Sequence, residues 1–254
     1  MLKKGDTGNE VLQLQKKLNE LDYPVNENSV FDTVTYNAVR AFQSQHLDKH
    51  GMPLEPDGKV GDLTQWSLNN PRKKVAAGST IDFLKMPAPT LGGSATGRKA
   101  LQAAINEIKA GAGEVGGNNK GRFVRKYHAP VGVAEGNSWC ASFVSWCYMQ
   151  AAGCKENMPF KYTAGARDVL RQFKNKGYAY NLDVTNPETT PQPGDVVVWW
   201  RIKLNGWQGH VGIVHHCKDG FLYTIEGNKA ANVQGFPYVL TRLEQILGFG
   251  RIPV

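Results

Sequence analysis

The stretch that decides the fold class is DVVVWWRIKLNGWQGHVGIVHHCKDGFLYTIE, residues 195–226. Valine, isoleucine and aromatic residues dominate three runs in it, 195–201, 210–216 and 220–226, and the hydrophobic period changes there to two. Glycine-containing turns separate the runs, so neighbouring strands can pair side by side. The sequence therefore predicts an antiparallel sheet, with a further strand over 248–252.

Helical patterns come before this sheet region. One apolar face at helical spacing predicts a helix over 101–110, and Ser138 is expected to cap a helix over 139–152. Thr163 is expected to cap a third helix. Helices followed by strands predict an α+β domain in which the helices pack on an antiparallel β-sheet.

The amino-terminal part is predicted to be a small three-helix domain over residues 1–70. Apolar residues recur there at helical spacing in three segments: Val11, Leu14, Leu18 and Leu21; Tyr36, Val39, Ala41 and Phe42; Leu63, Trp66 and Leu68. Residues 71–99 are rich in proline and glycine, which predicts a linker. The predicted domains are therefore 1–70 and 100–254.

Composition and charge exclude several classes of protein. With 41% hydrophobic and 20% charged residues among 254, the chain can build packed cores, so wholesale disorder is excluded. No apolar run approaches the ~18 residues that a membrane span needs, so we expect no membrane insertion. The polar start, MLKKGD, lacks the apolar stretch of a secretory signal, so we expect synthesis in the cytoplasm without a signal peptide.

The charge is distributed unevenly along the chain. Residues 1–70 hold 7 basic and 10 acidic side chains, whereas residues 71–254 hold 23 and 12. A basic second part favours an anionic partner, which could be nucleic acid, a membrane surface or the bacterial wall. Because the lysines are dispersed and not interleaved with aromatic residues, we predict no nucleic-acid partner.

The cysteines are predicted to be free thiols, and one of them is a candidate nucleophile. Cys140 falls in the first turn of its predicted helix, where the positive end of the dipole favours a thiolate. Cys147 and Cys154 lie farther along and fit the usual fate of a free cysteine, a buried structural residue. For Cys140 both interpretations remain open on this evidence alone.

A thiolate nucleophile needs a base and a group that orients the base. His210 stands at the entrance of a predicted strand between glycines, and the strand that begins after Gly194 should pair with it. Glu226 and Asn228 follow in the next strand at positions i and i+2, so they are expected to share one face. Either could hold the imidazole in the correct tautomer.

Together these segments resemble the CHAP domain, a family of cysteine, histidine-dependent amidohydrolases and peptidases related to the NlpC-type wall hydrolases. The resemblance covers roughly residues 101–254 and rests on four motifs in the family's order: WCASFVSW (139–146), PGDVV (193–197), GHVGIV (209–214) and EGN (226–228). It implies a papain-like fold in which Cys140 is the nucleophile, His210 the base and Glu226 the orienting acid. Asn228 matches a polar neighbour that in some members supports the oxyanion or the histidine.

Residues 1–70 resemble the three-helix peptidoglycan-binding domain. The matching positions are LKKGDTG (2–8), Val11, Leu14, Gln15, Leu18, Thr35, Ala38, Val39, Phe42, Gln43 and DGKVG (57–61). The family usually has a glycine where Ser29 or Val30 stands. The resemblance implies bacterial peptidoglycan as a partner; on the pattern alone, a spacer without a ligand is the alternative.

The two resemblances imply a cell-wall hydrolase that cleaves amide bonds in peptidoglycan, as a cysteine endopeptidase or an N-acetylmuramoyl-L-alanine amidase. We expect a monomeric phage endolysin that reaches the wall after release through a holin. The alternatives are an effector toxin delivered by a type VI-like secretion system, with an immunity protein as partner, and an inert wall-binding or phage-tail protein.

We expect no metal and no other cofactor. The stretch GGNNKGR (116–122) lacks the acidic oxygens that a calcium site requires. His215, His216 and Cys217 suggest zinc, but adjacent strand residues point to opposite faces, so the three should not close on one ion. Trp199, Trp200 and Trp207 could line a glycan groove or simply cover the sheet.

Overall fold

The computed structural model describes the chain as two compact units, Met1–Thr80 and Ile81–Val254. The residues described are 1–49, 54–55, 57–71, 88–229, 231–243 and 245–253. The predicted linker over 71–99 falls largely on residues 72–87, which lie outside this set. Each unit has its own hydrophobic core.

The first unit contains three helices, as the sequence predicts: α1 (Asn9–Glu20), α2 (Thr33–Gln45) and α3 (Asp62–Asn69). Asp32 begins α2 as its N-cap, because its side chain accepts a hydrogen bond from the Thr35 N–H. The apolar faces of the helices and the connecting segments bury one core, formed by Val11, Leu14, Leu18, Tyr23, Phe31, Val39, Phe42, Leu54, Val60 and Leu68.

Two buried glutamine side chains tie the loops of the first unit to its helices. Gln15 of α1 accepts the Ser29 N–H and donates to the Val30 carbonyl. Gln43 of α2 accepts the Gly58 N–H and donates to the Lys59 carbonyl. A buried amide is stabilising only when its polar atoms are paired, so these bonds fix both loops. Ser29 has a φ of 60°, a left-handed conformation that glycine adopts more readily than other residues.

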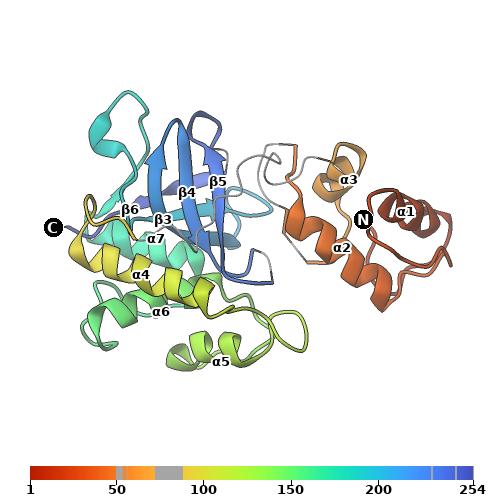
Figure 1. The fold of residues 1–254 in the computed structure, drawn as a ribbon, viewed down its shortest axis with the longest axis horizontal. Coiled ribbons are helices and arrows are strands. Elements are labelled where there is room, and N and C mark those ends of the chain that lie inside the picture. Colours follow the sequence, from red (N-terminus) through yellow and green to blue (C-terminus); the bar gives the residue numbers. More distant parts are fainter. Residues whose placement is uncertain (50–53, 56, 72–87, 230, 244, 254) are drawn as a thin grey trace. The chain divides into compact units, whose positions relative to one another are not determined.

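The second unit has the predicted α+β architecture, with helices on one face of an antiparallel sheet (Figure 1). Its helices are α4 (Ala95–Lys109), α5 (Arg122–His128), α6 (Cys140–Ala152) and α7 (Ala166–Asn175), with short 3-10 turns η1 (Ala129–Val131), η2 (Pro187–Thr189) and η3 (Leu240–Arg242). The strands are β1 (Ala179–Tyr180), β2 (Val196–Trp200), β3 (Gly209–Lys218), β4 (Phe221–Glu226), β5 (Gln234–Val239) and β6 (Ile246–Gly250).

The sheet has the order β1-β6-β2-β3-β4-β5, and every neighbouring pair is antiparallel. Side chains alternate between its faces, so Val198, Val211 and Ile225 pack with the helices in the main core. The residues that alternate with these along each strand lie on the other face, and Trp199 and His210 are among them. Trp199 pairs directly with His210 across β2 and β3, which confirms the predicted pairing of these strands.

Several local expectations differ from the structure. Helix α4 begins at Ala95, six residues before the predicted start, because Ser94 caps it by accepting the Gly97 N–H. Helix α6 begins at Cys140 without a side-chain cap from Ser138, and α7 begins after Gly165, not at Thr163. Helix α5 and strands β1 and β5 were not predicted.

A buried carboxylate joins three parts of the sheet. Asp195, just before β2, accepts hydrogen bonds from the Tyr180 hydroxyl (2.6 Å) and from Arg251 (2.9 Å). Tyr180 belongs to β1, and Arg251 follows β6. The pair with Arg251 offsets part of the cost of burying Asp195, although burial still raises the pKa of this carboxyl above its ordinary value.

Among the residues that the structure describes, no helix combines the length and the apolar character that crossing a membrane requires.

We expect Gly194→Ala to destabilise the second unit strongly. Gly194 has a φ of +84°, and a Cβ there would overlap the backbone of Gly97 in α4. Both the strained φ and the clash should lower the free energy of unfolding, together by about 3 kcal/mol or more. Urea unfolding followed by circular dichroism measures this change.

Gly177→Ala is the matched control. Gly177 has a similar φ of +71°, but no atom lies within 4 Å of the position that a Cβ would take. Because only backbone strain is added, Gly177→Ala should lower the free energy of unfolding by about 1–2 kcal/mol. Equal losses in the two variants would show that the approach of Gly194 to α4 is unimportant.

Candidate active site

Two of the predicted site residues are in direct contact. His210, the second residue of β3, lies with its Nε2 2.7 Å from Oε2 of Glu226, the last residue of β4. Both side chains are buried, His210 with 3% of its surface exposed and Glu226 with none. The structure therefore places Glu226, and not Asn228, against the imidazole.

A glycine makes this contact possible. His210 and Gly212 point to the same face of β3, and the Glu226 side chain crosses Gly212 to reach the imidazole. A Cβ on Gly212 would lie 2.6 Å from Glu226 Cγ, closer than carbon atoms tolerate. The motif GHVGIV thus supplies both the histidine and the space for its partner.

The Glu226 carboxylate has partners at both oxygens. Oε1 accepts hydrogen bonds from the Thr224 and Tyr238 hydroxyls, each at 2.6 Å. Oε2 faces His210 and also the Lys229 ammonium, at 3.0 Å. Burial raises the pKa of Glu226, but Lys229 and His210 outweigh it, and the pKa falls to about 2. Glu226 is therefore ionised at neutral pH.

An ionised Glu226 determines the tautomer of His210. A carboxylate only accepts hydrogen bonds, so His210 Nε2 must carry the proton, and Nδ1 is the basic nitrogen. Burial lowers the pKa of His210; Glu226 raises it, whereas Arg201 and Lys229 lower it further. The net direction is opposite to the one expected from a carboxylate alone, and it favours a neutral imidazole.

Cys140 is the first residue of α6, and only 5% of its surface is exposed. This confirms the predicted position in the first helical turn, where the dipole of the 13-residue helix stabilises negative charge. Cys147 lies two turns on in the core, where burial raises the pKa of its thiol well above the ordinary value. All four cysteines of the chain carry free thiols, as predicted.

The prediction that Glu226 and Asn228 share a strand face is wrong. Strand β4 ends at Glu226, and Asn228 has a left-handed φ of 64°, so its side chain leaves the direction of the strand. Asn228 Oδ1 accepts the backbone N–H of Trp139 at 2.9 Å, and its Nδ2 donates to Asn119 Oδ1 at 2.6 Å. Asn228 therefore positions the residue that precedes Cys140.

The end of β4 and the start of α6 lie against each other through a second contact. Gly227 has no side chain, and the Trp139 indole fills the space that a Cβ would need. The Trp139 Nε1 donates to Glu114 Oε1 at 3.2 Å. Within the segment 226–228, Glu226 contacts His210, while Gly227 and Asn228 contact Trp139, the residue before α6.

Sequence reasoning missed several residues that support this arrangement. Glu114 and Asn119 hold Trp139 and Asn228, while Tyr238 and Lys229 contact Glu226. Only Lys229 carried a local signal, since it directly follows the EGN motif. The others come from distant segments that the fold brings together.

The three tryptophans near β2 have different surroundings, and Trp200, the last residue of β2, is partly buried. Trp199 is fully buried, with its ring centroid 5.7 Å from that of His210. Trp207 is 84% exposed, in the loop that leads to His210. Arg167 of α7 holds this loop by donating to the Gln208 and Leu204 carbonyls, at 2.8 and 2.9 Å. Of the three, Trp199 is therefore part of the interior, and Trp207 is available to a partner.

The expectation that His215 and His216 point to opposite faces of their strand is wrong. A β-bulge between Val214 and His216 interrupts the alternation of β3, and His215 Nδ1 lies 2.8 Å from His216 Nδ1. Within the described part of the chain, no group of three or more His, Cys, Asp or Glu side chains is arranged to hold a metal ion. The metal-free mechanism remains a prediction.

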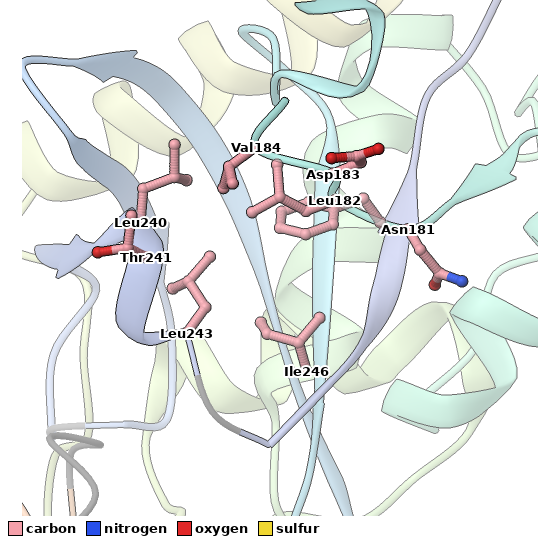
Figure 2. A pocket seen from close by; sticks show the side chains of 9 residues that line it. Asn181, Leu182, Asp183, Val184, Leu240, Thr241, Leu243 and Ile246 are labelled. Carbon is pink, nitrogen blue, oxygen red and sulfur yellow. The ribbon is translucent and has the colours of Figure 1, made fainter. Parts of the chain in front are cut away.

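A pocket of about 550 Å³ lies elsewhere in the second unit (Figure 2). Leucine, isoleucine and valine side chains from two segments, 181–184 and 240–249, converge on it, with Asp183 and Thr241 among them. None of the four predicted site residues lines it. Because Cys140, His210, Glu226 and Asn228 all lie outside this lining, the pocket is not part of the candidate active site.

Comparison with family models identifies both units. A model described as the CHAP domain matches residues 132–228, which include Cys140, His210 and the EGN segment. The chain carries a CHAP domain. A model described as a peptidoglycan binding domain matches residues 7–68. Searches of the curated proteins and of the solved structures give no match.

The arrangement of the two domains is that of a cell-wall hydrolase, with peptidoglycan as its substrate. The CHAP match begins at Gly132, after α5, and ends at Asn228, two residues after the glutamate that contacts His210. The segments that supply Lys229 and Tyr238 to the Glu226 carboxylate follow the matched region.

We expect Gly212→Ala to impair the CHAP domain without unfolding it. The added methyl group displaces Glu226 from His210, and a displacement of about 1 Å at such a site costs up to about 100-fold in rate. Release of soluble fragments from purified walls measures the loss.

Gly220→Ala serves as the control for this variant. Gly220 has a positive φ, +78°, but it lies in the β3–β4 turn, where no atom comes within 4 Å of the place a Cβ would occupy. Equal rates in the two variants, with both shown to be folded by circular dichroism, would contradict the need for the Glu226 contact.

Proposed function

We propose that the protein cleaves amide bonds in peptidoglycan by a thiol mechanism in which Cys140 is the nucleophile, His210 the base and Glu226 the group that orients the base. The observation that carries this proposal is the buried 2.7 Å contact between His210 and Glu226, at the end of the sheet where α6 begins. It leaves Nδ1 of a neutral imidazole as the proton acceptor.

The reaction requires Cys140 Sγ to reach His210 Nδ1 at this end of the sheet. His210 takes the thiol proton, and the sulfur attacks the amide carbonyl carbon to form a tetrahedral oxyanion. The positive end of the α6 dipole favours both the thiolate and the oxyanion. When the intermediate collapses, the C–N bond breaks and His210 Nδ1–H protonates the leaving amine.

Hydrolysis of the thioester completes the cycle. His210 removes a proton from water, the hydroxide adds to the thioester carbonyl, and the C–S bond breaks. The carboxylic acid product leaves, and the proton returns to Cys140. In this scheme Glu226 keeps His210 Nε2 protonated throughout, so that only Nδ1 exchanges protons, while Asn228 fixes the backbone before Cys140.

The bond cleaved lies either within the stem peptide or between the peptide and the glycan. Mass spectrometry of fragments released from purified walls separates these outcomes, because an endopeptidase leaves peptide on the glycan and an amidase frees it. We propose that the protein acts as a phage endolysin, released to the wall through a holin. A neighbouring holin gene supports this role, whereas a neighbouring immunity gene favours an effector toxin.

We expect Cys140→Ala to reduce wall hydrolysis at least about 1000-fold while leaving the fold intact, since it removes the nucleophile and little volume. Iodoacetamide should inactivate the unsubstituted protein and label Cys140. The control is Cys147→Ala, on the same helix and fully buried. It should keep most of its activity, although its free energy of unfolding should fall. If both variants hydrolyse walls equally, Cys140 is not the nucleophile.

We expect residues 1–71 alone to sediment with purified peptidoglycan. This fragment has its own core, and its first 70 residues carry 7 basic and 10 acidic side chains, so attraction to an anionic wall cannot explain its retention. The measurement is the fraction found in the pellet with an excess of walls. A fragment that is folded but stays in the supernatant, under conditions that sediment the full chain, would identify the first unit as a spacer.

A further inference from the structure

A buried lysine lies beside the candidate base and is not used by the mechanism above. The Lys229 side chain is completely shielded from solvent, and its Nζ lies 3.0 Å from Glu226 Oε2. The same oxygen contacts His210 Nε2 at 2.7 Å. One carboxylate oxygen therefore faces two groups that can carry positive charge.

The fold builds a specific environment for this ammonium. Its Nζ lies 4.4 Å from the ring centroid of Tyr238, 4.6 Å from that of Phe236 and 5.3 Å from that of Trp199. Aromatic faces attract a cation, and the attraction is stronger where water is excluded. The left-handed conformation of Asn228 turns the chain between Glu226 and Lys229, so the lysine lies beside the carboxylate three residues earlier.

The charges around His210 then decide its protonation state. Glu226 of β4 is negative, Lys229 balances it, and Arg201 after β2 adds a further positive charge. Tyr238 of β5 and Thr224 of β4 contribute neutral hydroxyl donors to Glu226. Protonation of His210 would add a positive charge to a buried cluster whose carboxylate is already paired, which is unfavourable in a medium of low dielectric.

We propose that Lys229 is a positioning residue that acts through Glu226: its buried ammonium neutralises the carboxylate, so that His210 is held as the neutral imidazole that can accept the Cys140 proton. This proposal rests on the proposed role of His210 as the base. It goes beyond that role by assigning the control of the base to a residue that does not touch the reacting atoms.

The first test uses the unsubstituted protein. Histidine-selective ¹⁵N labelling and NMR report the charge and tautomer of His210, whose signals are assigned by their loss in His210→Asn. We expect a neutral ring with the proton on Nε2 at about pH 6, below the ordinary midpoint of histidine. An imidazolium at that pH would overturn the proposal, whether or not any Lys229 variant folds.

The second test compares variants by their pH–rate profiles for wall hydrolysis. In Lys229→Met the carboxylate loses its balancing charge, so the imidazolium form of His210 is favoured. The acid limb of the profile, which is the fall in rate at low pH, therefore moves to higher pH. The midpoint of the acid limb should rise by about 1–3 pH units, the effect of removing one close charge. Lys229→Arg keeps the charge and should restore the profile of the unsubstituted protein.

Tyr238→Phe is the matched control, because it removes a 2.6 Å hydrogen bond to Glu226 without changing any charge. Its acid limb should stay in place even if its rate falls. An acid limb that is unmoved in folded Lys229→Met, or moved equally in Tyr238→Phe, would reduce Lys229 to a structural role. The NMR measurement needs no hydrolysis, so a failure of the proposed function, such as an active Cys140→Ala, is recognised separately.

Discussion

The second unit is organised around a carboxylate that has no access to water. An isolated charge in a protein interior is strongly unfavourable, and Glu226 is tolerated because hydroxyls, an imidazole and an ammonium surround it. These partners come from β3, β4, β5 and the turn after β4. A one-residue slip of any of these strands would turn a partner to the other face and leave the charge unpaired. The chemistry of the site and the register of the sheet therefore depend on the same interaction.

Three consecutive residues connect this end of the sheet to the start of α6. Glu226 contacts the imidazole, Gly227 admits the Trp139 indole, and Asn228 accepts the Trp139 N–H. The thiol of Cys140 follows Trp139 directly. The nucleophile and the base thus belong to different elements of the fold, yet their supports lie within one short turn, which leaves little freedom for one to shift without the other.

The sequence predicts much of the fold because its patterns are regular where the structure is regular. The period of two indicates β2, β3 and β4, and the glycines of the turns separate them. The expectations fail where one residue leaves its regular conformation. Asn228 leaves the strand because its φ is left-handed, and the bulge in β3 brings His215 and His216 together. Helix α5 was missed because its seven residues are too few for a clear periodic pattern.

The same contrast between local pattern and tertiary contact explains which parts of the candidate site were accessible to prediction. Cys140, His210 and Glu226 stand in short motifs, each at the end of a recognisable element. Lys229 follows such a motif, but lysine is almost never fully buried, so position alone did not single it out. Glu114, Asn119 and Tyr238 are brought in by the tertiary fold. The roles of Cys140, His210, Glu226 and Asn228 in a reaction remain predictions.

Two separate cores have a consequence for the behaviour of the protein on heating. The apolar residues that stabilise the first unit and those that stabilise the second form separate clusters, so each unit is expected to melt as its own cooperative block. A domain of about 70 residues buries a smaller fraction of its surface than one of about 150 and has less stability to lose. A warmed preparation should therefore first lose its hold on whole walls, while soluble fragments of the same polymer are still hydrolysed.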